Sequence, residues 1–270
     1  MQNDQAAGLR RLFRAAPPRV VGLVPCSASV MPWVVRQMQA RVRESARILA
    51  LDEWGNSGNL ADSLLISSSR FDLLQAVEGS VSVKDCLIEV ERGFELASVS
   101  RLAMALGADR MVNQRVLGLF KNLQQHFDEW IVVARAADAN GVSRLLQAVP
   151  DVVLLADAKP ESIFSAYATL KQLSELNGLS VASIVLTQFD VRGSYALANN
   201  LERVVREQLG MKLNFVMSLE EALAVESFVS VSDGPEKFLE RLLIAVSSPA
   251  RRVVSRRSQY ALCELAAAPK

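Results

Sequence analysis

Short uncharged runs rich in valine, isoleucine and leucine recur along this 270-residue chain, and longer helix-like segments separate them. The runs are continuous rather than alternating, which is typical of strands buried on both faces of a sheet. We therefore expect an α/β fold with a mostly parallel central sheet and helices on both faces. The expected strands are 19–24, 48–52, 94–99, 130–134, 152–156, 181–186 and 213–216, and the expected helices are 34–47, 111–127, 160–176, 194–209 and 235–246.

Prolines mark the expected boundaries within the chain. A pair of prolines separates a short N-terminal helix from the body, and a further proline separates the body from a basic tail. The length allows one large domain with a substantial core. The expected parts are an N-terminal docking helix and linker at 1–18, an α/β domain at 19–248 and a tail at 249–270.

The net charge of +1 is unevenly distributed. Residues 1–19 carry four arginines and one aspartate (+3), and residues 249–270 carry four arginines, one lysine and one glutamate (+4), which leaves −6 for residues 20–248. A duplex-DNA binder needs a broad basic surface. We therefore expect no direct nucleic-acid binding and interpret the two ends as docking segments.

Histidine and cysteine are too scarce for several kinds of site. His126 is the single histidine, and three scattered cysteines cannot form a disulfide framework or a zinc cluster, so a reducing, cytoplasmic setting is expected. The longest uncharged run, 20–35, contains two prolines and is too short to span a bilayer. Asp4 and four arginines precede the first apolar stretch, so we expect no signal peptide.

The turn after the first strand is the usual phosphate cradle of open α/β sheets. A cradle needs glycines, so that backbone N–H groups can converge on an anion, and a lysine for charge. Here no glycine lies between Leu23 and Trp54, and the first lysine is Lys84. Pro25 and Pro32 each remove an N–H group, and Pro32 instead suits the first turn of a helix. Bound nucleotide is therefore not expected, and an ordinary α/β domain remains an alternative on this loop alone.

Two segments carry a family resemblance. Residues 4–10 read Asp-Gln-Ala-Ala-Gly-Leu-Arg, and residues 51–89 include Leu-Asp-Glu-Trp, Phe-Asp-Leu-Leu-Gln-Ala-Val-Glu-Gly and Val-Lys-Asp-Cys-Leu-Ile-Glu. Both resemble the MinD/ParA-type proteins that regulate flagellar number and placement, the FlhG or FleN family, whose N-terminal signature is Asp-Gln-Ala-x-x-Leu-Arg. The helix expected at 160–171 is also similar to one in MinD-type proteins, so the resemblance covers residues 4 to about 246.

Most of the family's nucleotide chemistry has no counterpart here. The family loop Lys-Gly-Gly-Val-Gly-Lys-Thr falls on residues 27–33, where only the valine is retained. By the resemblance, two lysines, three glycines and the magnesium-binding threonine are replaced, and of two acids at the next strand end one remains. Val133 and Thr187 stand where the family has an aspartate and a base-reading asparagine. The vestigial residues are Ser27, Val30, Met31, Pro32, Trp33 and Asp52.

These losses together remove charge neutralisation, metal coordination and base recognition. We therefore expect a non-catalytic protein without cofactor or metal. Asp52 is interpreted as a loop cap rather than a metal-linked acid. Trp33 and Trp54 are expected to fill the volume that nucleotide and metal would occupy.

The two ends are the candidate interaction segments. In the family the N-terminal signature engages the flagellar GTPase FlhF, an SRP-type GTPase, and simple packing on the body is the alternative. The expected partner contacts are Asp4, Gln5, Leu9, Arg10, Leu12 and Phe13. The tail resembles the lipid-binding helix of MinD-type proteins only weakly, so peripheral contact with an anionic membrane and a solvated tail both stay open for Arg251, Arg252, Arg256 and Arg257.

The sequence therefore predicts a pseudo-ATPase regulator of flagellar assembly that acts by protein contact. Two alternatives remain. One is an ATPase with a divergent nucleotide loop, and the other is a scaffold or adaptor that binds neither nucleotide nor GTPase.

Overall fold

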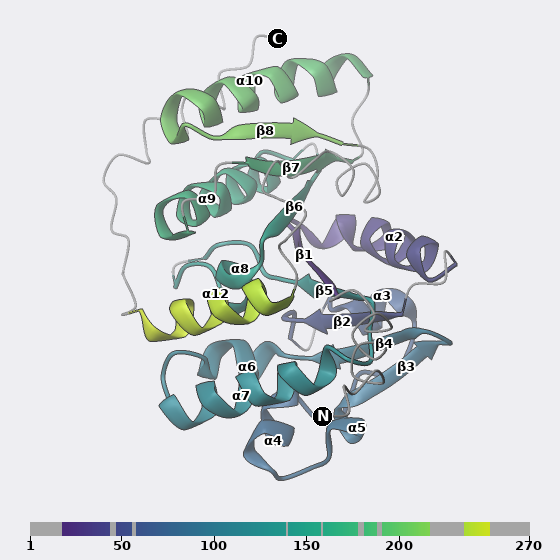
Figure 1. The fold of residues 1–270 in the computed structure, drawn as a ribbon. Helices are drawn as coiled ribbons and strands as arrows, with labels where there is room; N and C mark the ends of the chain where they lie inside the picture. Colours follow the sequence, from purple (N-terminus) through teal and green to yellow (C-terminus); the bar gives the residue numbers. More distant parts are fainter. Residues whose placement is uncertain are drawn as a thin grey trace, which may run out of the picture.

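A computed structural model describes residues 18–43, 47–55, 58–138, 140–157, 159–177, 181–187, 191–216 and 235–248. These residues contain one eight-stranded sheet of order β3-β4-β2-β5-β1-β6-β7-β8, flanked by helices (Figure 1). The strands are β1 (Arg19–Pro25), β2 (Ile48–Asp52), β3 (Leu87–Glu91), β4 (Phe94–Ser98), β5 (Glu129–Val133), β6 (Asp151–Ala156), β7 (Val181–Leu186) and β8 (Lys212–Phe215).

All strand pairs are parallel except β3 with β4, so the predicted fold class is confirmed. Each of the seven expected strands is present within a residue or two of its expected bounds. The sequence analysis missed β3. This strand lies at the edge of the sheet and alternates apolar residues with Glu89 and Glu91, which are exposed, so it lacks the continuous apolar run of the buried strands.

The five expected helices are present, and five short ones of four to six residues were not predicted. Elements this short carry too few residues to show a 3.6-residue period. Two expected helices begin three residues earlier than expected, at Met31 and at Val191, and the helix expected to reach residue 127 ends at Leu123. The helices are α2 (Met31–Arg43), α3 (Leu60–Leu64), α4 (Leu73–Glu78), α5 (Val83–Cys86), α6 (Ser100–Ala105), α7 (Arg110–Leu123), α8 (Arg144–Ala148), α9 (Pro160–Asn177), α10 (Val191–Leu209) and α12 (Pro235–Ser247).

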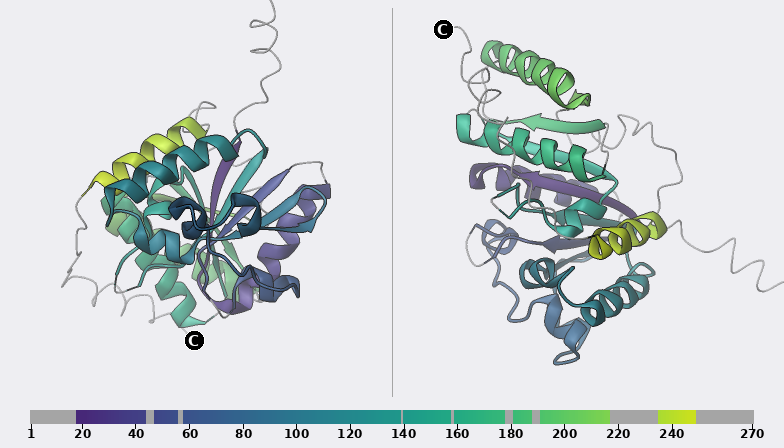
Figure 2. Two further views of the ribbon diagram at one scale, coloured as in Figure 1. Left: turned by 90° about the horizontal axis from the view of Figure 1, so that it is seen from below. Right: turned by 90° about the vertical axis from the view of Figure 1, so that its left-hand side faces the viewer.

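Two apolar clusters cover the two faces of the sheet. Successive strand residues alternate between them, as Val20 and Val21 do in β1. The smaller cluster packs α2 and α3 on one face. The larger packs α4, α6, α7, α8, α9 and α12 on the other, and α10 lies against the edge strand β8. Figure 2 shows α2 on the opposite side of the strands from α7 and α12.

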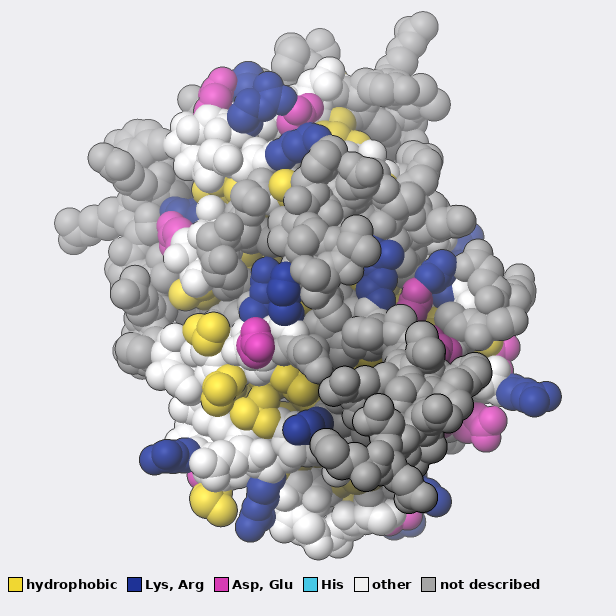
Figure 3. Space-filling model, in the orientation of Figure 1, with side chains coloured by type: hydrophobic (Ala, Val, Ile, Leu, Met, Phe, Trp, Pro, Cys, Tyr) yellow, Lys and Arg dark blue, Asp and Glu magenta, His cyan; other side chains and the backbone are white. Residues whose placement is uncertain are grey.

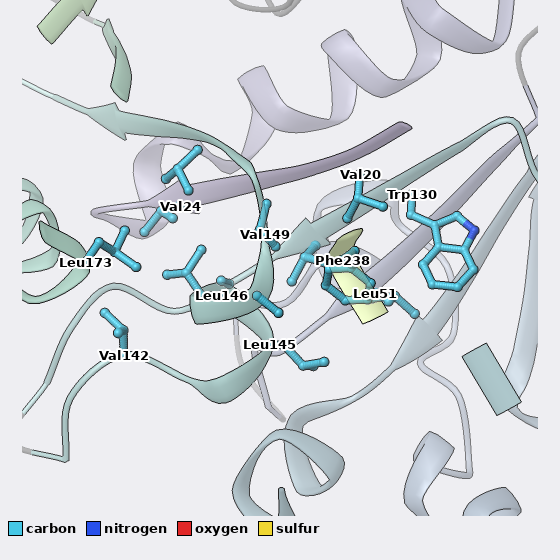
Figure 4. Packing of buried hydrophobic residues seen from close by; sticks show 14 of the residues in the cluster. Val20, Val24, Leu51, Trp130, Val142, Leu145, Leu146, Val149, Leu173 and Phe238 are labelled. Carbon is cyan, nitrogen blue, oxygen red and sulfur yellow. The ribbon is translucent and has the colours of Figure 1, made fainter. Parts of the chain in front are cut away.

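Helix α8 packs unusually close to β1. A Cβ on Gly22 would lie 3.1 Å from Leu146 and 3.2 Å from Val149, so glycine in the strand permits the close approach. Beside this contact, Phe238 of α12 packs between helix α7 and the sheet. Its ring centroid lies 6.1 Å from those of Phe120 and Trp130 (Figure 4).

Apolar side chains also reach the surface on this side of the molecule. Figure 3 shows them gathered over α12 and the neighbouring α6–α7 region, with Lys and Arg side chains around them. The exposed apolar residues there are Met104, Met111, Leu243 and Ile244.

The expected interaction segments at the two ends lie outside the described residues. This holds for Asp4, Gln5, Leu9, Arg10, Leu12 and Phe13 and for Arg251, Arg252, Arg256 and Arg257. Across the ranges given above, the helices are too short or too polar to cross a bilayer.

We expect Phe238→Ala to lower the free energy of unfolding by about 3–5 kcal/mol, because it leaves a cavity beside two aromatic rings that cannot close. Leu243→Ala on the same helix is the matched control, and it should stay within about 0.5 kcal/mol of wild type because half of that side chain is already exposed. Urea unfolding monitored by circular dichroism measures both values. Equal losses would show that the aromatic contact does not secure α12.

Candidate functional site at the carboxyl edge of the sheet

The loop after β1 lies at the carboxyl edge of the sheet, where open α/β sheets bind their ligands. β1 is central, with β5 on one side and β6 on the other. After a short 3-10 turn, η1 (Ala28–Val30), helix α2 begins with Pro32 as its second residue. The N–H groups of Cys26, Val30 and Met31 donate to backbone carbonyls. These amides are therefore committed to the protein's own backbone.

The side chains of this loop mostly face inward. Val30 and Met31 are 1% exposed, and Trp33 is 9% exposed in the apolar cluster beneath α2, while Pro32 is exposed. The tryptophan ring thus belongs to the core between α2 and the sheet. Cys26 is a poor nucleophile, because burial raises the pKa of its thiol to about 12.

A carboxylate of the chain stands against the same loop. Asp157, directly after β6, accepts hydrogen bonds from Ser27 Oγ at 2.9 Å and from Ser29 Oγ at 2.5 Å. The side chain is 1% exposed, and its other oxygen accepts from the Lys159 N–H at 3.1 Å. Burial opposes ionisation, but these three donors outweigh it and hold the pKa of Asp157 below its usual range. A negative charge is therefore fixed beside the loop after β1.

The sequence analysis missed Asp157. The residue lies 130 positions from Ser27 and carries no motif of its own. The signal in the sequence was its position directly after the apolar run at 152–156, which forms β6 beside β1.

Asp52 acts as a loop cap in the structure. Its carboxylate accepts from the N–H groups of Trp54 at 2.9 Å and Leu60 at 2.7 Å, which fixes the turn between β2 and α3. Burial nevertheless raises the pKa of Asp52 to about 6. The hollow beside it measures about 60 Å³, far below the roughly 300 Å³ at which small-molecule pockets begin. Trp54 lines this hollow and its indole N–H donates to the Ala134 carbonyl at 3.4 Å.

Glu53 is a second acid at this strand end that the sequence analysis did not single out. It is 2% exposed, and its carboxylate accepts from Ser143 Oγ at 2.5 Å and from the Arg135 N–H at 3.2 Å. Burial raises the pKa of Glu53 to about 7 despite these donors. The side chain therefore connects β2 to the loop between β5 and α8 and titrates near neutral pH.

Val133 and Thr187, the two other positions that the sequence analysis singled out, place no free polar side chain at this edge. Val133 is fully buried in β5, and the Thr187 hydroxyl donates to the Ala156 carbonyl at 3.4 Å. Among the residues that the structure describes, no group of three or more His, Cys, Asp or Glu side chains is placed to hold a metal ion.

No protein-family model matches the sequence, and no curated protein matches it significantly. Solved structures do share the fold. MinD in the MinC:MinD cell division protein complex of Aquifex aeolicus is 12% identical with a TM-score of 0.53, covering 86% of this chain and 97% of that chain. An McdA variant of Cyanothece in complex with ATP is 16% identical with a TM-score of 0.52, covering 87% and 98%.

A ParA family ATPase of Chlorobium tepidum is 17% identical with a TM-score of 0.50, covering 90% of this chain and 98% of that chain. At such identities the likeness establishes the fold. The chain therefore has the α/β architecture of MinD and ParA-type ATPases.

Glu53 makes stability depend on pH in a direction opposite to that of an ion-paired acid. Its folded pKa lies above the ordinary 4.5, so folding binds a proton between pH 4.5 and about 7, and stability falls as pH rises through this window. Each pKa unit corresponds to about 1.4 kcal/mol. We expect Glu53→Gln to flatten this fall in urea titrations at pH 5, 6, 7 and 8.

The exposed Glu78→Gln is the matched control and should leave the pH dependence of stability unchanged. An unaltered slope in Glu53→Gln would disprove the raised pKa. The fall that Asp52 contributes should persist in both variants.

Proposed function

We propose that this chain is a nucleotide-independent regulator of flagellar assembly, number or placement, which works by contact with an FlhF-type GTPase rather than by hydrolysing ATP. The fold is that of MinD and ParA-type ATPases. The flagellar assignment rests on the N-terminal signature at residues 4–10 and on the segment at 51–89.

One observation carries the loss of ATP binding: the Asp157 carboxylate and the Ser27 and Ser29 hydroxyls hydrogen-bond to one another at the loop after β1. A phosphate chain brings several negative charges, and a fixed carboxylate within a few ångströms repels them. No lysine or arginine lies between Val20 and Val35, so Lys159, beside Asp157, is the cation that offsets part of this repulsion. Three loop amides that could bind phosphate already donate to carbonyls.

The contact mechanism rests on the N-terminal segment. Leu9, Leu12 and Phe13 share one face at helical spacing, and Asp4 suits the N-cap position. Gly8 costs about 1 kcal/mol of helix propensity, so the isolated helix is marginal and gains its stability on a partner. We place the protein in the cytoplasm, where the basic tail would give it access to the inner membrane surface.

The first test is nucleotide binding. Isothermal titration of the full chain with ATP and Mg²⁺ should show no saturable heat at nucleotide concentrations below about 1 mM. A ParA-type ATPase of the same fold, titrated under the same conditions, is the positive control. Saturable, magnesium-dependent binding by this chain would favour the alternative, an ATPase with a divergent loop.

The second test is partner binding. The full chain should retain an FlhF-type GTPase in a pull-down and change its rate of GTP hydrolysis, and a chain lacking residues 1–16 should do neither. Leu9→Ala with Phe13→Ala should weaken the interaction strongly, because apolar anchors dominate helix docking. Leu243→Ala, which alters an exposed leucine of α12, is the matched control and should bind as wild type does.

The outcomes separate the remaining alternatives. Binding without any change in GTP hydrolysis would indicate a scaffold or adaptor. Failure to bind the GTPase or another flagellar protein, with no effect of the deletion, would refute the contact mechanism.

A further inference from the structure

A cleft separate from the β1 loop opens at the carboxyl edge of the sheet. It lies between α6, the loop after β5 and the start of α8, and its volume is about 370 Å³. Small-molecule sites typically measure about 300–1,000 Å³, so the cleft can hold a compact organic molecule. The apolar residues that line it include Met104, Leu106 and Val142. The polar and charged residues that line it are Glu53, Arg135, Asp138, Asn140, Ser143 and Arg144.

Helix α9 holds the walls of this cleft in place. The Ala137 N–H donates to Thr169 Oγ1 at 2.9 Å, and the Val142 N–H donates to Gln172 Oε1 at 2.9 Å. Gly141 has φ +95°, and a Cβ there would lie 3.0 Å from Gln172 Oε1, so this turn requires glycine. Ala137, Gly141 and Val142 are therefore held in place before a ligand binds, which reduces the entropy lost on binding.

Arg144 lines the cleft and has no carboxylate partner among the described residues. Its guanidinium donates to Gln147 Oε1 and to the Ser248 carbonyl, each at 3.1 Å, and both acceptors are neutral. The Arg144 side chain packs against Gly107, where an added Cβ would lie 3.3 Å from Arg144 Nε. Loss of hydration lowers the pKa of the Arg144 guanidinium. Five N–H donors and two neutral acceptors leave capacity for an anion.

Two further groups set the charge of the cleft. The Arg135 side chain is exposed on its rim, while the Arg135 N–H donates to Glu53 at the cleft's base. Because the pKa of Glu53 is about 7, this acid is mostly neutral in mildly acidic solution. Asp138 also lines the cleft, but it is exposed and accepts from the Asn140 N–H at 2.7 Å. When Glu53 is neutral, the charged residues that line the cleft are therefore two arginines, Arg135 and Arg144, and one exposed carboxylate, Asp138.

We propose that this cleft binds a small organic anion, a carboxylate or phosphate monoester joined to an apolar group. Arg144 and Arg135 contact the anionic group, since guanidinium groups match carboxylate and phosphate oxygens in charge and in geometry. Met104 and Leu106 contact the apolar group. The site is separate from the β1 loop, so it stands whether or not that loop binds ATP.

The probes are hexanoate and hexyl phosphate, which share one apolar chain and differ in the anionic group. Hexanol and hexylammonium test the need for negative charge, and inorganic phosphate tests the need for the chain. Chemical shifts of the backbone amides report each titration of the full protein. At least one hexyl anion should bind with saturating shifts at residues 135–144, more tightly than the three control compounds, and the preferred anion identifies the ligand class.

Arg135→Gln and Arg144→Gln should each weaken binding of the preferred anion about tenfold, because a charge-assisted hydrogen bond contributes roughly 1.5–3 kcal/mol. Arg115→Gln, at an exposed arginine of α7 outside the cleft, is the matched control and should leave the affinity unchanged. Arg135→Gln should disturb the fold less, because the hydrogen bond to Glu53 comes from the backbone N–H of residue 135 and is retained after the substitution.

The pH dependence of hexanoate affinity is a further test, because apolar contacts with the hexyl chain alone would not change with pH. Its affinity should fall between pH 6 and pH 8, because Glu53 ionises and adds negative charge at the base of the cleft. The charged groups around Glu53 are Asp52 on β2, Arg135 and Asp138 on the loop after β5, and Arg144 on α8. Glu53→Gln should reduce this fall. If neither hexyl anion binds better than hexanol, or if all three arginine variants bind alike, the proposal is wrong.

Discussion

The interior strands of this sheet are covered by apolar side chains on both faces, and this constraint governs where the chain can place polar groups. Residues within β1, β2, β5 and β6 alternate between two clusters that exclude water. An acid inside such a strand would lie in one cluster or the other without solvent. Three of the buried acids, Asp52, Glu53 and Asp157, accordingly stand where strands β2 and β6 end, at one edge of the sheet.

The three acids reach different electrostatic states because their donors differ. Two serine hydroxyls and a backbone amide keep Asp157 ionised, whereas desolvation dominates at Asp52 and Glu53 and moves their pKa values to about 6 and about 7. The loop beside Asp157 is thus negatively charged and internally bonded. The cleft beside Glu53, in contrast, is lined by Arg144, whose guanidinium donates to two neutral acceptors.

Patterns among neighbouring residues were sufficient to predict most of the secondary structure. The seven predicted strands and the five long helices follow from continuous apolar runs and helical periodicity, and Pro32 signals the start of α2. The edge strand β3 and the short helices lack such runs. The contacts of Asp157 with Ser27 and of Glu53 with Ser143 join residues 130 and 90 positions apart, so only the assembled sheet brings them together.

The serine-bound Asp157 also constrains how a phosphate site could be engineered at this edge. A lysine introduced alone into the loop after β1 would meet a ready-made counterion and form an internal ion pair before any phosphate arrived. Glycines introduced alone would free amides next to an unchanged negative charge. A phosphate site at this edge would therefore need replacements on two segments that are 130 positions apart in the sequence.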